Sequence, residues 1–205
     1  IPNAPSQDSC SLVLIRGSKM RILLASSEVY PYSKTGGLAD AVGALGKALA
    51  QGGHQVGIVA PMYRGIRERF PKIQKADWRF DLPLGCKQVG AELWTQEATE
   101  RLTLYFVDQP AYFDRVGLYG NNGSDYDDNA ERFIFFDKCV VNLARYLPWR
   151  PEVLHVHDWH TGLACAYNAF SRRAGKSRAA SVFTIHNLAF QGLFARAAFA
   201  DLGLP

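Results

Sequence analysis

A pair of glycines near the start of the chain separates two segments with different apolar patterns. Arg21–Ser27 contains a run of apolar residues that is typical of a buried parallel strand. After Gly36-Gly37, apolar residues recur at helical spacing, which predicts a core-facing helix that ends at Gly52-Gly53. This apolar stripe consists of Leu38, Ala41, Val42, Leu45, Ala48 and Leu49. Because a strand, a glycine pair and a helix start bring free N–H groups and a positive dipole end together, we expect an anion site there.

Lys34 adds a positive charge beside this glycine pair. An exposed loop lysine is the simplest explanation for such a residue, but its place next to two glycines favours a role in anion binding. The spacing of the run matches neither the dinucleotide-binding fingerprint nor the P-loop. The residues alone therefore indicate an anion site, with phosphate as the simplest occupant.

Strand and helix patterns alternate along the rest of the chain. The expected buried strands are Gln55–Ala60, Glu152–His157 and Ser181–Ile185. The expected helices are Arg64–Phe70, a long helix from Asp128 to Leu147, and Thr161–Ala174. The segments in which apolar and polar residues alternate are Trp78–Leu82, Val89–Gln96 and Leu102–Asp108. This order predicts one α/β domain, in which a parallel sheet carries right-handed helical crossovers and a small antiparallel insert.

Unusual polar residues follow three of the expected parallel strands. They are Glu28–Gly37 after the first strand, His157–His160 after another, and His186-Asn187 after the last. Ligands of open α/β sheets bind outside the carboxyl ends of the strands, so these segments are expected to share one rim. Their convergence is the strongest evidence for a site that the residues themselves provide.

Several of these polar residues have more than one explanation. His155, His157, Asp158 and His160 offer a possible metal shell, although a core histidine bonded to the backbone explains His155 more simply. For His160 we prefer contact with a hydroxyl group or with developing negative charge. Asp40 suits either a helix N-terminus or a bound acceptor, and Glu28 is equally open. At the long helix, Asp128 and Glu131 have the spacing of a capping box.

Composition excludes several classes of protein. Of the 205 residues, 48% are hydrophobic and 20% charged, and no apolar run approaches the ~20 residues that cross a bilayer. The net charge is +4, and the basic residues are scattered apart from a group at 172–178, so we expect neither a nucleic-acid nor a membrane partner. The four cysteines lack CxxC spacing, which favours a reducing compartment. Residues 1–19 look like a leader or extension, and residues 20–205 like the folded domain.

Four motifs in order resemble bacterial glycogen synthases and plant starch synthases. They are Lys34-Thr35-Gly36-Gly37-Leu38-Ala39-Asp40, Tyr126-Asp127-Asp128-Asn129 with Arg132-Phe133, His157-Asp158-Trp159-His160, and Thr184-Ile185-His186-Asn187 with Gln191-Gly192. The resemblance runs from about Met20 to Pro205. It implies that the chain is one lobe of a two-lobe glycosyltransferase, and that this lobe is Rossmann-like with helices on both faces of its sheet. The implied reaction is the transfer of glucose from ADP-glucose to an α-1,4-glucan, with retention of configuration at the anomeric carbon.

The resemblance also implies roles for individual residues. Lys34 would meet the donor diphosphate, with the N–H groups of Gly36 and Gly37 close to it. His160 would reach the transferred glucose near the reaction centre. The contacts implied on the glucose or glucan side are Asp40, Asn187 and Gln191. No metal or other cofactor is implied, and the compartment would be the bacterial cytoplasm or, alternatively, the plastid stroma.

In the resembling family the second lobe carries the nucleotide pocket and most of the charge that balances the leaving phosphate. We therefore expect residues 1–205 alone to transfer little or no glucose. Two other functions stay open: a glucan-binding module without catalysis, and an unrelated α/β domain that binds a phosphate or nucleotide.

Overall fold

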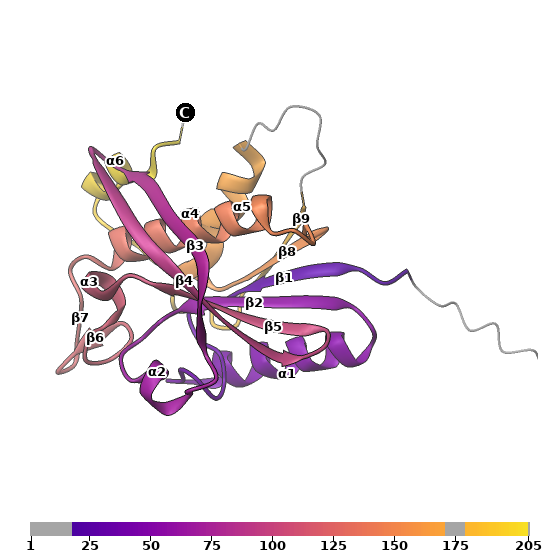
Figure 1. Ribbon diagram of the computed structural model, residues 1–205. Helices are drawn as coiled ribbons and strands as arrows, with labels where there is room; N and C mark the ends of the chain where they lie inside the picture. Colours follow the sequence, from indigo (N-terminus) through magenta and orange to yellow (C-terminus); the bar gives the residue numbers. More distant parts are fainter. Residues whose placement is uncertain (1–17, 171–178, 205) are drawn as a thin grey trace, which may run out of the picture.

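The computed structural model describes residues 18–170 and 179–204, and its main feature is a seven-stranded sheet (Figure 1). The strand order is β3-β4-β5-β2-β1-β8-β9. The strands are β1 (Arg21–Ala25), β2 (Gln55–Pro61), β3 (Gln74–Leu84), β4 (Lys87–Thr99), β5 (Leu102–Asp108), β8 (Val153–His157) and β9 (Ala180–Thr184). Strands β5, β2, β1, β8 and β9 are parallel, whereas β3 and β4 run antiparallel at one edge. The predicted α/β class and antiparallel insert are thus confirmed.

Helices cover both faces of the sheet. The long helices are α1 (Gly37–Gln51), α4 (Asn129–Tyr146) and α5 (Trp159–Phe170), and the short ones are α2 (Ile66–Arg69), α3 (Pro110–Phe113), a 3₁₀ turn at Arg196–Ala198 and α6 (Phe199–Leu202). Helix α1 lies under one face, while α4 and α5 lie together over the other (Figure 1). Helix α1 approaches β2 so closely that a Cβ on Gly46 would lie 2.5 Å from Ile58 Cδ1.

The order of the parallel strands reverses between β1 and β8. The chain moves from β1 outward to β2 and β5, then returns to β8 on the other side of β1 and continues to β9. In open α/β sheets, the crevice at such a switch point is where ligands bind. The segments after β1 and β8, which contain Lys34–Gly37 and Asp158–His160, lie at this crevice.

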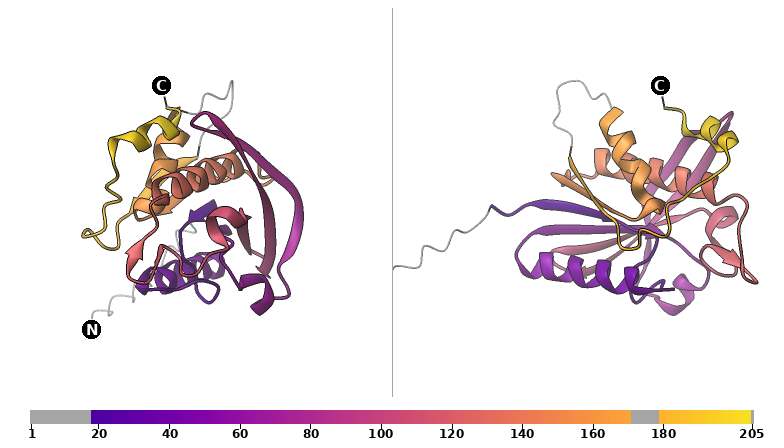
Figure 2. Two further views of the ribbon diagram at one scale, coloured as in Figure 1. Left: turned by 90° about the vertical axis from the view of Figure 1, so that its left-hand side faces the viewer. Right: turned by 180° about the vertical axis from the view of Figure 1, so that it is seen from behind.

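The antiparallel strands β3 and β4 form a long hairpin that reaches over α4 (Figure 2). Lys87 Nζ binds Glu131 Oε1 at 2.7 Å, and Lys138 Nζ donates to the Pro83 carbonyl at 2.7 Å. The hairpin is therefore fastened to the helical layer as well as to the edge of the sheet.

Local details differ from the sequence predictions at the two helices that flank the site. Asp128 precedes α4, but its carboxylate makes no capping bond, since it binds the Arg115 guanidinium at 2.7 and 2.6 Å. Glu131 bonds to Lys87 and Tyr112 rather than to the helix end, so the predicted capping box is wrong. Helix α5 begins two residues before the expected Thr161, which places His160 in its first turn. The polar loop before α4 contains a small hairpin, β6 (Gly120–Asn121) with β7 (Ser124–Asp125).

Burial is unequal across the sheet. The central strands β1, β2 and β5 are almost wholly buried, whereas β9 at the edge is exposed along most of its length. In the described part of the chain, no helix combines the length and apolar character needed to cross a bilayer. The basic group at 172–178 and residues 1–17 of the expected leader lie outside the described residues.

Candidate functional site

A cavity of about 920 Å³ opens at the carboxyl ends of the parallel strands. It brings together three segments that are far apart in the sequence: the glycine loop (Lys34–Gly37), the start of α5 and the loop after β9. The predicted site residues that line it are Gly36, Gly37, His160, Asn187 and Gln191. The structure therefore gathers most of the residues that the sequence singled out.

Lys34 and Asp40 are not among the residues that line this cavity. They pair with each other, Nζ to Oδ2, at 2.6 Å, and their side chains are 46% and 51% exposed. The hydrogen bond with Asp40 raises the pKa of Lys34, so the ammonium is charged at neutral pH. Lys34 is thus an exposed positive charge paired with Asp40, directly before the cavity-lining Thr35.

Gly36 and Gly37 present open space to the cavity. Gly36 is the residue before α1 and Gly37 is its first residue. A Cβ atom on either glycine would meet no protein atom within 4 Å, so the backbone is accessible from the cavity side. The N–H groups of the first helical turn have no partner within a helix, and they suit an incoming anion.

Glu28 occupies part of the predicted anion site. Its carboxylate accepts hydrogen bonds from Thr35 N at 2.5 Å, Gly36 N at 3.4 Å and Thr35 Oγ1 at 2.6 Å. Of the two glycine N–H groups that the sequence suggested for phosphate, the Gly36 group is thus already directed at a carboxylate. Glu28 accepts no hydrogen bond from Gly37 in the described part of the chain, so the Gly37 N–H group does not have this competitor.

His160 is enclosed by aromatic rings. Its imidazole stacks on Tyr119, with ring centroids 4.6 Å apart, and on Trp159, at 3.9 Å. Phe133 meets it edge-on at 4.8 Å. These rings hold His160 in one orientation at the cavity wall, where the residue is only 8% exposed.

This enclosure controls the charge of His160. Burial, with a smaller effect from the positive charge of Arg132, lowers the pKa of His160 to about 3. The imidazole is therefore neutral at pH 7 and acts as a hydrogen-bonding group rather than as a cation. Its Nδ1 atom is buried and has no hydrogen-bond partner among the described residues. This ring nitrogen is therefore able to form one more hydrogen bond.

Asp158 joins the ends of β8 and β9 next to His160. It has a positive φ of 58°, which is uncommon for a residue other than glycine and is often seen at functional sites. Its Oδ1 atom accepts the His186 N–H at 2.6 Å, and the rings of His186 and His157 bond at 2.9 Å. These contacts bring the third segment, His186-Asn187, to the rim that the sequence predicted.

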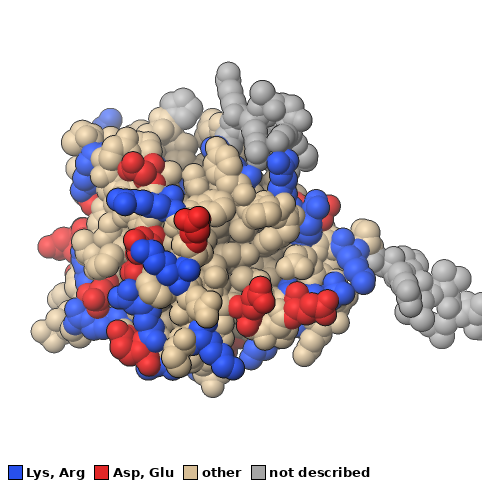
Figure 3. Space-filling model, viewed as in Figure 1, with Lys and Arg blue, Asp and Glu red and all other residues tan. Residues whose placement is uncertain are grey.

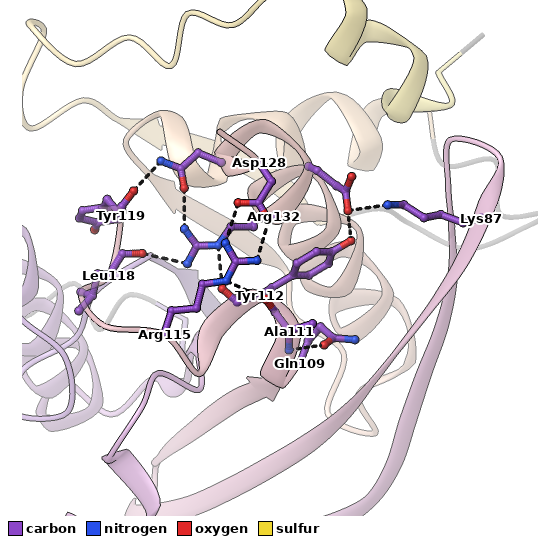
Figure 4. A network of polar contacts seen from close by, with 11 residues as sticks. Lys87, Gln109, Ala111, Tyr112, Arg115, Leu118, Tyr119, Asp128 and Arg132 are labelled. Atoms are coloured by element: carbon purple, nitrogen blue, oxygen red, sulfur yellow. Dashed lines mark hydrogen bonds and ion pairs between the residues drawn. The ribbon is translucent and has the colours of Figure 1, made fainter. Parts of the chain in front are cut away.

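A buried arginine fixes the loop that carries Tyr119 (Figure 4). Arg132 is fully buried and donates to the carbonyls of Tyr112 at 2.7 Å and Leu118 at 2.9 Å. Asn129 Nδ2 donates to the Tyr119 carbonyl at 2.8 Å, and Arg132 in turn bonds to the Asn129 side chain at 2.5 Å. The start of α4 thereby sets the position of the Tyr119 ring against His160.

The histidine cluster does not have the geometry of a metal site. Within residues 18–170 and 179–204, no three His, Cys, Asp or Glu side chains are grouped so as to hold a metal ion. His155 Nε2 instead bonds to Thr184 Oγ1 at 2.8 Å, a side-chain partner where we expected a backbone one.

On the face shown in Figure 3, acidic and basic residues are interspersed.

Sequence reasoning missed Tyr119 and left Glu28 undecided. Both line the cavity, as do Asp125, Asn129 and Asp158. Tyr119 lies in a glycine-rich loop without a periodic pattern, so no signal in the sequence marks it. Glu28 is three residues beyond β1, and this position at a strand end was its only indication.

Comparison with known proteins agrees with this geometry. The family model described as the starch synthase catalytic domain matches residues 21–205. The chain belongs to this family. Membership removes the alternative of an unrelated phosphate-binding α/β domain, and it confirms the resemblance drawn from the four sequence motifs.

Relatives and a solved structure extend this finding. The chain is 42% identical to the glycogen synthase of Syntrophotalea carbinolica over 187 residues, and 39% identical to that of Opitutus terrae over 189 residues. These matches cover 90% and 91% of this chain but only 38% and 39% of the relatives. The chain thus spans less than two fifths of their length.

The fold is that of a solved family member. The catalytic domain of starch synthase IV from Arabidopsis thaliana, whose structure was determined bound to ADP and acarbose, matches with a TM-score of 0.75 and 26% identity. The match covers 92% of this chain and 38% of that one. The Rossmann-like arrangement is therefore shared with a starch synthase catalytic domain.

Proposed function

We propose that this chain supplies one side of the active site of an enzyme that transfers glucose from ADP-glucose to an α-1,4-glucan. Transfer takes place at the non-reducing end of the glucan and retains the anomeric configuration. The observation that carries the proposal is the meeting of Gly37, His160 and Gln191 in one cavity at the switch point of the sheet, in a chain of the starch synthase family.

The roles we assign follow from charge and burial. Lys34 and the N–H groups at the start of α1 bind the diphosphate, because both favour negative charge. His160, a neutral donor held by aromatic rings, hydrogen-bonds the transferred glucose while the bond to the diphosphate breaks. Asn187 and Gln191, which line the cavity, contact the sugars from the rim, and Asp40 contacts them from its place beside Lys34. We expect no metal or other cofactor. We assign the protein to the bacterial cytoplasm, because the two glycogen synthases named above come from bacteria.

The decisive experiment measures glucose transfer from ADP-glucose to glycogen. Because the matched relatives are longer, two proteins are compared: this chain, and an extended protein in which it is continued by the part of the Syntrophotalea carbinolica glycogen synthase beyond the shared region. We expect transfer by the extended protein, unaffected by EDTA, and little or none by this chain alone. Digestion with an enzyme specific for α-1,4 links tests the product. An extended protein that folds but transfers no glucose contradicts the proposal.

A glucan-binding module without catalysis is the second candidate. It is favoured by Phe190 and Leu193, which line the cavity and are 68% and 85% exposed, because exposed apolar side chains suit the faces of sugar rings. Titration of this chain with maltoheptaose measures that affinity. Binding that survives Lys34→Ala, together with no transfer by the extended protein, would select this function.

A further inference from the structure

Glu28 is a buried carboxylate to which the proposed roles give no task. It is 3% exposed, and in the described part of the chain no basic side chain forms an ion pair with it. Its oxygens are instead satisfied by two N–H groups and two hydroxyls: Thr35 N, Gly36 N, Thr35 Oγ1 and Tyr119 OH. A buried carboxylate is costly unless it is hydrogen-bonded, and its removal would leave the two N–H groups and the Thr35 hydroxyl without this acceptor.

The bonds from Thr35 and Gly36 determine the shape of the glycine loop. Glu28 Oε2 accepts both backbone N–H groups, at 2.5 and 3.4 Å, and Oε1 accepts the Thr35 hydroxyl at 2.6 Å. The loop is thereby held from the side of β1, and the first turn of α1 is left open to the cavity. Glycine residues give the backbone little stiffness of its own, so this carboxylate supplies the constraint.

Tyr119 links the same carboxylate to His160. Its hydroxyl lies 2.7 Å from Glu28 Oε1 and 2.8 Å from Ser27 Oγ, while its ring stacks on His160. The two hydrogen-bonded residues are 91 positions apart in the chain. A continuous path of contacts therefore runs from the glycine loop, through Glu28 and Tyr119, to the imidazole.

We propose that Glu28 and Tyr119 are positioning residues that set the distance between the glycine loop and His160. This inference rests on the proposed function, in which the loop holds the diphosphate and His160 the glucose. Breaking the bond between these two groups requires both ends of the donor to be held in register, and a misplacement of about 1 Å can cost on the order of 100-fold in rate. The pair therefore acts on the rate of transfer more than on donor binding.

The test uses Tyr119→Phe in the extended protein. This substitution keeps the ring that stacks on His160 and removes the hydroxyl that binds Glu28. We expect kcat to fall about 10-fold, with the KM for ADP-glucose changed less than about twofold. The matched control is Tyr126→Phe, because the Tyr126 hydroxyl also bonds within this loop, to the Val116 carbonyl, but does not line the cavity. The control should leave both constants within about twofold.

A pair of substitutions at Glu28 separates geometry from charge. In Glu28→Gln the amide oxygen can accept the two backbone N–H groups, while its NH₂ faces the two hydroxyls, which can rotate to accept. In Glu28→Ala every one of these bonds is lost. We expect Glu28→Ala to lower kcat on the order of 100-fold and Glu28→Gln to recover most of that loss. A Gln variant as inactive as the Ala variant overturns the positioning role.

A measurement on this chain alone is independent of the proposed activity. By NMR, Tyr119→Phe should speed amide exchange of Thr35 and Gly36 at least about threefold and shift the ring resonances of His160, and Tyr126→Phe should do neither. Unchanged exchange and resonances in Tyr119→Phe overturn the inference, whether or not the extended protein is active. Kinetic constants of Tyr119→Phe equal to those of an active parent overturn it as well. An inactive parent with the expected NMR changes counts against the proposed function only.

Discussion

Polar side chains next to the cavity are held in opposite ways beside the glycine loop and around His160. On the glycine-loop side, Lys34 and Asp40 are about half exposed, at 46% and 51%, and their ion pair is in contact with water. On the other side, His160 is 8% exposed and is surrounded by the rings of Tyr119, Phe133 and Trp159.

This difference separates binding from positioning. An exposed ion pair is screened by salt and contributes little to stability, so Lys34 is free to exchange Asp40 for a ligand phosphate. A buried neutral imidazole cannot move or change its charge easily, so it is suited to meet one atom of a substrate at a fixed place. The predictions below test this division, beginning with the largest effect.

Substitution of His160 should have the largest effect on the rate. In the extended protein, His160→Ala should lower kcat by about 100- to 1,000-fold, the size seen when one preorganised donor is removed from an active site. Steady-state kinetics with ADP-glucose and glycogen measure this. His54→Ala is the control, because His54 lies before β2 at the opposite end of the sheet. Values of kcat and KM within threefold of the parent would show that His160 serves only to pack against its aromatic neighbours.

Substitution of Lys34 should weaken donor binding. Lys34→Ala is expected to raise the KM for ADP-glucose on the order of 10-fold, because a charge-assisted contact with the diphosphate is lost. Since the residue is exposed, the effect should shrink as salt is raised. Lys34→Arg should restore part of the affinity. Lys47→Ala, at an exposed lysine within α1, the helix that follows Lys34, should have no effect. A loss of kcat with an unchanged KM would break the division between the two sides.

The buried histidines should make stability depend on pH. Burial lowers the pKa values of His157 and His160 to about 3, whereas the unfolded chain binds these protons near pH 6.5. The contribution of each neutral histidine to the free energy of unfolding is therefore fully present above pH 6.5. As the pH falls toward 3 this contribution is lost, and each histidine shifts the folding equilibrium toward the unfolded state by about 10-fold per pH unit.

Comparison with a variant isolates the contribution of His160. Burial raises the pKa of Asp137, which changes stability in the opposite sense over part of this range. Urea unfolding of this chain and of His160→Gln at pH 7, 6 and 5 cancels that effect. As the pH falls, the free energy of unfolding of this chain should decrease relative to that of the His160→Gln variant. A difference that is independent of pH would mean that His160 is not desolvated.

Gly37 tests access to the glycine loop. Because a Cβ at Gly37 meets no protein atom within 4 Å, Gly37→Ala should not lower the Tm, and alanine is the better helix former. The same methyl group stands where the diphosphate approaches, so we expect the KM for ADP-glucose to rise about fivefold. Gly46→Ala should do the reverse and lower the Tm, because its Cβ would lie 2.5 Å from Ile58 Cδ1.

The smallest effect is expected at Asp40. Its ion pair with Lys34 is exposed, so Asp40→Asn should change the Tm of this chain by about 1 °C or less. Thermal unfolding measures this at low and at high salt. A larger loss at low salt would show that the pair is a structural element of the loop.

Local pattern was enough to predict most of the fold and the rim of the sheet at which the cavity lies. The apolar run of β1, the helical stripe of α1 and the runs of β2, β8 and β9 are signals within one segment each. Parallel strands joined by helices leave their carboxyl ends on one side of a sheet, so the meeting of Gly36, His160 and Asn187 followed from topology. The roles of the individual site residues stay predictions.

Only the tertiary structure decided which polar groups became partners. Asp128 has the spacing of a helix cap, yet Arg115 reaches its carboxylate and takes both oxygens. Tyr119 carries no local signal, yet it joins Glu28, 91 positions away, and stacks on His160. Backbone periodicity is a property of neighbours in sequence and can be read from them. The partner of a buried side chain is whichever donor or acceptor the packed chain brings within about 3 Å, and that is decided by the fold as a whole.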